Sequence, residues 1–111
     1  MKRPATEAER EHLARVRALP CIVCYLRGEA QTSPKEAHHL KRDPTTGQSL
    51  GGSQKAPHWA TIPLCRDTHH WNGVNVHMGS REFERRWGNE IALLERTYEM
   101  LNLAYPYQVA S

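Results

Sequence analysis

AHHL at residues 37–40 and IPLCRDTHH at residues 62–70 are the two stretches that decide the fold. Each lies at the end of a short run that is typical of a strand, and the second continues into a short helical segment. The residues between the two stretches are rich in Gly, Pro, Ser and Thr, which predicts a loop. We expect, in order, a strand, a loop, a strand and a helix, over residues 35–40, 43–57, 59–64 and 66–71.

Helices are expected on both sides of this central unit. Thr6 and Glu9 form a capping-box pattern that starts a helix, and Pro20 ends it. From Ser80 onward, apolar residues recur every three or four positions and line one face of a helix. They are Phe83, Trp87, Ile91, Leu94, Tyr98 and Leu101. Gly88 interrupts the pattern at a cost of roughly 1 kcal/mol relative to Ala, so the helix can kink or split there.

The composition narrows the class of protein without deciding it. The chain has 111 residues, which is the length of one domain, and 39% of them are apolar. A domain this small often needs a metal or a partner as a staple. No apolar run is long enough for a membrane span, and residues 1–20 lack a signal-peptide core, so we expect a cytoplasmic protein. The net charge of +3 is compatible with nucleic-acid binding but is common in other proteins.

Three cysteines and a cluster of histidines stand out. Cys21 and Cys24 are spaced C-x-x-C, and with Cys65 they make three cysteines, a poor disulfide set because one would be left over. Thiolates and imidazoles are preferred zinc ligands, and structural zinc sites are four-coordinate. His69 lies four residues after Cys65, on the same face of the expected helix. We therefore predict a structural Zn²⁺ on these four residues that ties the N-terminal helix to the central unit.

The remaining histidines can perform hydrolytic chemistry. Adjacent residues on a strand point to opposite sides, so His38 and His39 can take different roles. One can bind a metal while the other accepts a proton from water. Hydrolysis of a phosphodiester needs both functions. His70 and His77 are available as further metal ligands.

These residues resemble a known motif. A His-His pair that ends a strand, then a loop, an Ile-Pro-Leu-Cys strand and a His-bearing helix are similar to the His-Asn-His (HNH, ββα-metal) nuclease motif. More narrowly, AHHL…GG…K…IPLCR…HH…H.G…FE…G, over roughly residues 20–90, resembles the phage and prophage recombination-enhancement (RecA-dependent) nucleases. The resemblance implies that His38 is the first metal ligand and His39 the general base. It implies that His70 (or His69) and His77 complete the site for Zn²⁺, Mg²⁺ or Mn²⁺.

The chain departs from this pattern at several positions. Ala60 or Thr61 stands where the motif often has Asn, and His58 is the nearest polar residue that can orient His39. Counting from Pro63 favours His69 as the catalytic ligand, whereas the position of the His-His pair favours His70. Four cationic residues flank the expected site and can contact phosphates: Lys41, Arg42, Lys55 and Arg66.

Taken together, the sequence predicts an α+β protein with a small ββα-metal core. The expected single domain, 1–111, consists of an N-terminal helix (1–20), a zinc knuckle plus ββα core (21–78) and a long C-terminal helix (79–105). The predicted function is a metal-dependent DNA endonuclease of phage or prophage type acting in recombination, with a recombinase filament as a further partner. The alternative is a catalytically inactive, zinc-stapled DNA-binding module. A redox protein is disfavoured because the βαβ context of such C-x-x-C motifs is absent, and the oligomeric state is open.

Overall fold

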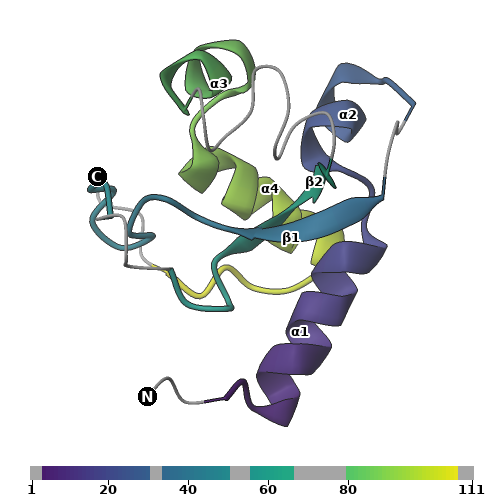
Figure 1. Cartoon of the computed structure of the whole chain (residues 1–111), viewed down its shortest axis with the longest axis vertical. Coiled ribbons are helices and arrows are strands. Elements are labelled where there is room, and N and C mark those ends of the chain that lie inside the picture. The colour runs from purple at the N-terminus through teal and green to yellow at the C-terminus, as the bar shows by residue number, and fades with distance from the viewer. Residues whose placement is uncertain (1–3, 31–33, 51–55, 67–79, 108–111) are drawn as a thin grey trace.

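The computed structural model describes residues 4–30, 34–50, 56–66 and 80–107. In chain order, these residues form α1 (Glu7–Ala18), α2 (Ile22–Arg27), β1 (Lys35–His39), β2 (Thr61–Cys65), α3 (Ser80–Trp87) and α4 (Glu90–Leu101). Figure 1 shows the two strands at the centre with helices around them. The predicted α+β class is confirmed. Of the helix expected over residues 66–71, all but Arg66 lies outside the described residues.

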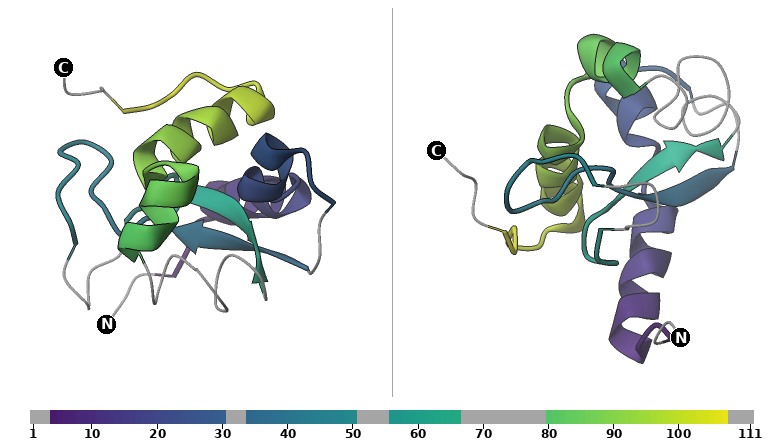
Figure 2. Two further views of the ribbon diagram at one scale, coloured as in Figure 1. Left: turned by 90° about the horizontal axis from the view of Figure 1, so that it is seen from above. Right: turned by 60° about the vertical axis from the view of Figure 1, so that its left-hand side comes forward.

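β1 and β2 form an antiparallel pair. Lys35 is opposite Cys65, and His39 is opposite Thr61, so the two chemically distinctive clusters mark opposite ends of the pair. β2 is buried along its whole length, because α4 lies along it and α1 and α2 pack at the end where β2 finishes (Figures 1 and 2). β1 is more exposed and is mostly half-buried. The sheet therefore presents β1 outward and uses β2 to anchor the core.

The N-terminal helix begins as the sequence predicts. The Thr6 side chain accepts a hydrogen bond from the Glu9 backbone N–H at 3.1 Å, and the Glu9 carboxylate accepts one from the Thr6 N–H at 2.8 Å. This reciprocal pair is the predicted capping box. α1 ends at Ala18, two residues before Pro20. The residues after Pro20 form a helix rather than a tight knuckle, since Cys21 is the N-cap residue of α2.

The long C-terminal helix is two helices. α3 ends at Trp87 and α4 begins at Glu90. Gly88 adopts a φ of +94°, in the left-handed region that glycine tolerates best, and so breaks the chain direction. Asn89 then caps α4 by accepting a hydrogen bond from the Ala92 N–H at 2.9 Å. The apolar residues recur regularly across residues 83–101, as in one helix. Because Gly88 and the Asn89 cap divide this stretch, its apolar residues lie on two helices, α3 and α4, each with its own packing face.

The core is built from β2 and the inner faces of the helices. Its largest fully buried side chains include Phe83 of α3, Ile22 of α2, Ile62 and Leu64 of β2, and Leu94 of α4. Among the helices in the described part of the chain, none has the length and apolar character needed to cross a bilayer.

Candidate metal centre and active site

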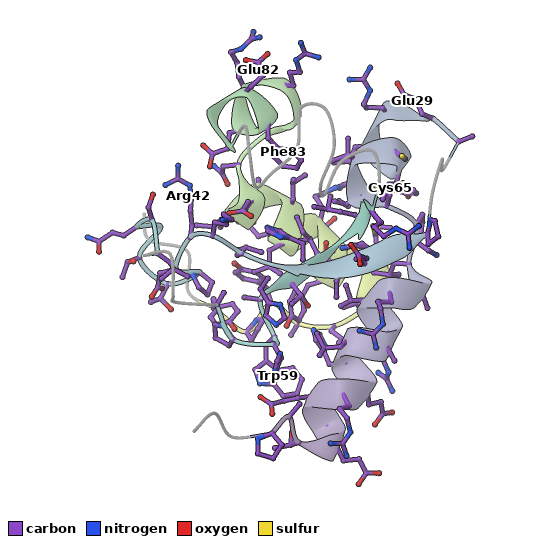
Figure 3. All side chains as sticks on the ribbon, viewed as in Figure 1. Glu29, Arg42, Trp59, Cys65, Glu82 and Phe83 are labelled. Carbon is purple, nitrogen blue, oxygen red and sulfur yellow. The ribbon has the colours of Figure 1, made fainter. Side chains whose placement is uncertain are left out.

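The three cysteines meet at one end of the sheet. Cys21 precedes the first turn of α2, Cys24 lies within that turn, and Cys65 is the last residue of β2. All three are buried, and their sulfur atoms lie within 4.8 Å of one another. Figure 3 shows Cys65 where β2 approaches α2. Segments more than 40 positions apart in the chain thus place three soft ligands around one point.

This cluster fits a zinc ion. Sulfur atoms bound to zinc at about 2.3 Å in a tetrahedral site lie roughly 3.8 Å apart, and the Cys24 and Cys65 sulfurs are 3.7 Å apart. Burial raises the pKa of the Cys21 thiol and that of the Cys24 thiol, which favours the neutral form of both thiols until a metal ion binds. The cluster can therefore bind a metal ion such as zinc, with loss of thiol protons. His69, the predicted fourth ligand, lies outside the described residues.

His39 and His58 are in contact at the opposite end of the sheet. His39 is the last residue of β1, and His58 belongs to the turn that precedes β2. The Nε2 atom of His39 lies 2.8 Å from the Nδ1 atom of His58, within hydrogen-bond distance. The Thr61 hydroxyl donates to the His58 carbonyl oxygen at 3.0 Å and so supports the turn. The structure thus joins the predicted base to the residue predicted to orient it.

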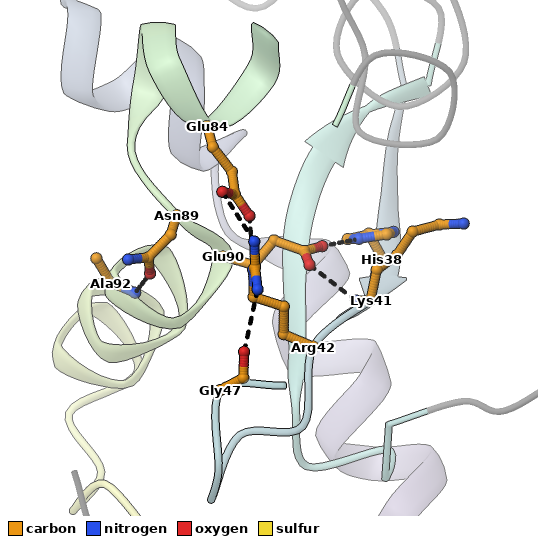
Figure 4. Close-up of polar contacts among 8 residues, drawn as sticks. All are labelled: His38, Lys41, Arg42, Gly47, Glu84, Asn89, Glu90 and Ala92. Carbon is orange, nitrogen blue, oxygen red and sulfur yellow. Dashed lines mark hydrogen bonds and ion pairs between the residues drawn. The ribbon is translucent and has the colours of Figure 1, made fainter. Parts of the chain in front are cut away.

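His38 points to the other side of the strand and is buried, with 1% of its surface exposed. Its Nε2 atom lies 2.5 Å from a carboxylate oxygen of Glu90, at the start of α4. The other Glu90 oxygen accepts a hydrogen bond from the Lys41 backbone N–H at 2.8 Å (Figure 4). His69, His70 and His77, the other predicted ligands of the catalytic metal, lie outside the described residues.

Similarity to known proteins assigns the chain to a family. The family model described as recombination enhancement, RecA-dependent nuclease matches residues 5–102. The chain belongs to the RecA-dependent nuclease family. The matched range includes all three cysteines, and it also includes His38, His39 and His58. Membership implies an enzyme that acts on nucleic acid, with DNA as its substrate. No curated protein matches the chain.

Glu90 is a residue of this RecA-dependent nuclease that the sequence did not predict to be part of the site. Its spacing could have indicated that it is buried, because Glu90 lies four residues before Leu94 and so shares the buried face of α4 with it. A carboxylate on such a face needs a partner, and a buried charge without one is costly. Its position directly after the Asn89 cap, where acidic residues are common, gave it an ordinary explanation.

The cationic residues that were predicted to flank the site differ in position and in their contacts. The Arg42 guanidinium donates to both Glu84 carboxylate oxygens, at 2.7 and 3.1 Å, and to the Gly47 carbonyl oxygen at 3.0 Å (Figure 4). Arg42 thus ties the loop after β1 to α3. Lys41 and Arg66 are both exposed, but Lys41 follows β1 at the histidine end of the sheet, whereas Arg66 follows Cys65 at the sulfur end. Lys55 lies outside the described residues.

The nuclease therefore has two chemically different ends on one strand pair. Lys35, which is paired with Cys65, and His39 are four residue steps apart on β1, a distance of roughly 13 Å along an extended strand. The sulfur cluster ties α2 to β2, while the histidines occupy the end where β1 leaves the sheet. A structural metal at the first end would be separate from chemistry at the second.

Proposed function

We propose that this protein is a metal-dependent DNA endonuclease of the HNH type, with His39 as its general base. The observation that carries the proposal is the 2.8 Å contact between His39 and His58, next to a His38 side chain that points to the opposite face. Membership of a nuclease family supports the choice of a phosphodiester as substrate. Strand alternation supports the separation of the two histidine roles.

The His39–His58 contact supports a specific proton path. In the proposal, the Nε2–H group of His39 donates to Nδ1 of His58, which leaves a lone pair on Nδ1 of His39. That nitrogen takes a proton from a water molecule in line with the scissile phosphorus. His58 then does for His39 what the Asn of the motif would otherwise do, which accounts for Ala60 and Thr61 at the expected Asn position.

A divalent metal completes the proposed site. His38 would hold it together with His70 (or His69) and His77, and the bound ion would stabilise negative charge on the phosphate and the leaving oxygen. His38 fits this role because it is buried and its ring is held by a carboxylate, as the rings of metal-binding histidines commonly are. The exposed side chain of Lys41, two residues after His39, would contact a backbone phosphate and position DNA without reading its sequence.

The test is nicking of supercoiled plasmid by the zinc-loaded protein with Mg²⁺, Mn²⁺ or Zn²⁺, with and without a RecA filament on the DNA. His39→Ala should lower the rate by roughly 10²–10⁴-fold, the usual contribution of a general base. His58→Ala should lower it less, and His58→Asn should retain more activity than His58→Ala because an amide oxygen can still accept from His39. DNA affinity should be unchanged in all three variants.

Two results would reject the proposal. The first is equal nicking by wild type and His39→Ala. The second is no nicking by wild type under any metal or filament condition, combined with DNA binding that survives His39→Ala. The second result would favour the zinc-stapled DNA-binding module, the alternative suggested by the missing Asn.

A further inference from the structure

One buried carboxylate links α4 to the histidine end of β1. Glu90 is the first residue of α4, and its side chain is only 3% exposed. Each of its two oxygens has a partner from β1 or from the residues directly after it: the His38 ring at 2.5 Å and the Lys41 backbone N–H at 2.8 Å. Figure 4 shows the carboxylate reaching from the start of α4 across to both groups.

These two contacts lie on either side of His39. One holds the side chain of the preceding residue, and the other holds the backbone two residues later. Between them, the Leu40 N–H bonds to the Ala60 carbonyl oxygen at 3.1 Å. The backbone that carries His39 is therefore held from α4 and from the β2 side. His39 itself points away from Glu90, toward His58.

The carboxylate also selects the form of the His38 ring. An ionised carboxylate only accepts hydrogen bonds, so the nitrogen that faces it must carry the proton. With the proton on Nε2, the lone pair of the neutral ring is on Nδ1. A neutral imidazole whose second nitrogen donates to a carboxylate is the usual state of a metal-binding histidine.

The position of Glu90 in the core supports a role beyond packing. Its neighbours on the buried face of α4 include Leu93, Leu94 and Tyr98. An apolar residue at position 90 would avoid the cost of removing a carboxylate from water. Replacing buried ionic groups by apolar ones is often neutral for stability or even stabilising, so the need for a stable fold is a weak explanation for the buried Glu90–His38 pair. A charged residue at a position where the core would otherwise be apolar is expected at a functional site.

We propose that Glu90 is a positioning residue of the nuclease site: it holds His38 in its metal-binding tautomer and fixes the strand end that presents His39. This inference rests on the proposed function. Glu90 acts through His38 and the Lys41 backbone, and it touches neither DNA nor water in the reaction.

Glu90→Gln tests this role with little change in shape. The amide oxygen can still accept from the Lys41 N–H, but the amide NH₂ group, a donor, replaces the oxygen that faces His38. The His38 ring must then accept at Nε2 and carry its proton on Nδ1. Glu99→Gln is the matched control, because Glu99 is an exposed carboxylate of the same helix that pairs with Arg96.

Three measurements are made on each protein carrying one equivalent of zinc. Long-range ¹H–¹⁵N spectra of labelled histidine report the His38 tautomer. The EPR signal of free Mn²⁺ reports Mn²⁺ affinity, and plasmid nicking reports activity. We expect Nε2–H in wild type, Nδ1–H in Glu90→Gln, and a loss of Mn²⁺ affinity of roughly 10–100-fold in that variant, as for other partners of metal-binding histidines. Glu99→Gln should match wild type in all three.

The possible failures are distinguishable. If wild type binds Mn²⁺ and nicks DNA while Glu90→Gln keeps the His38 tautomer or Mn²⁺ affinity of wild type, the role of Glu90 is rejected and the proposed function stands. If wild type neither binds Mn²⁺ nor nicks, both are rejected. If circular dichroism shows that Glu90→Gln is unfolded, the His38 tautomer is measured in Glu90→Asp instead. It keeps a carboxylate, so His38 should remain Nε2–H, and a proton on Nδ1 would overturn the inference.

Discussion

Truncation of Phe83 should release α3 from the core. Phe83 is fully buried, whereas the neighbouring Glu82 points outward from α3 (Figure 3). Arg85 and Arg86 of the same helix are exposed and pair with Glu82 at the surface. Surface pairs of this kind add little stability, so the burial of Phe83 is the main apolar contribution from the described α3 side chains.

Removing a buried aromatic ring by Phe→Ala costs about 3–5 kcal/mol, which is a large part of the roughly 5–15 kcal/mol by which a domain is stable. At about 4–6 °C per kcal/mol for a chain of this size, the Tm of Phe83→Ala should fall by roughly 12–30 °C. Urea denaturation followed by circular dichroism gives the free energy of unfolding, and calorimetry gives the Tm. Both are measured on zinc-saturated protein.

Leu103→Ala is the control, because Leu103 is 41% exposed and its truncation should change stability by no more than about 0.5 kcal/mol. A loss below about 1 kcal/mol in Phe83→Ala would refute the reasoning. It would mean that the burial of Phe83 does not hold α3 to the folded core.

Two further predictions concern pH and metal. His12 is buried against the rings of Trp59 and Tyr98, and burial, with a smaller effect of Arg15, lowers its pKa. The unfolded chain therefore takes up this proton first, so stability should fall as the pH drops below about 6.5, with no effect of His12 above it. His12→Phe should flatten this loss between pH 7.5 and 5.5 in urea titrations, and an equal loss in both proteins would contradict the assignment. Metal analysis should find one tightly bound zinc that Cys21→Ser abolishes, together with a second, exchangeable metal that depends on His70 or His77. A single zinc that survives Cys21→Ser would reject this division.

Local chemistry made much of the fold predictable. The capping box at Thr6 and the two strands around the His-His and Ile-Pro-Leu-Cys stretches depend on neighbouring residues, so their patterns could be recognised directly. The shared preference of thiolates for one metal also allowed us to group Cys65 with the C-x-x-C pair, without knowing the path of the chain between them. The split at Gly88 was foreseen only as a possibility, because the Asn89 cap that completes it is equally typical of a loop.

The sequence by itself determined which residues can perform chemistry: three thiols for one metal, and two adjacent histidines whose side chains must diverge along a strand. Only the tertiary structure decided what each histidine faces. His39 meets His58 across a turn, but His38 meets Glu90 from a helix 52 positions away. The physical reason is that strand alternation acts between neighbouring residues. The face that a distant helix turns toward the strand depends on how the whole core packs around β2.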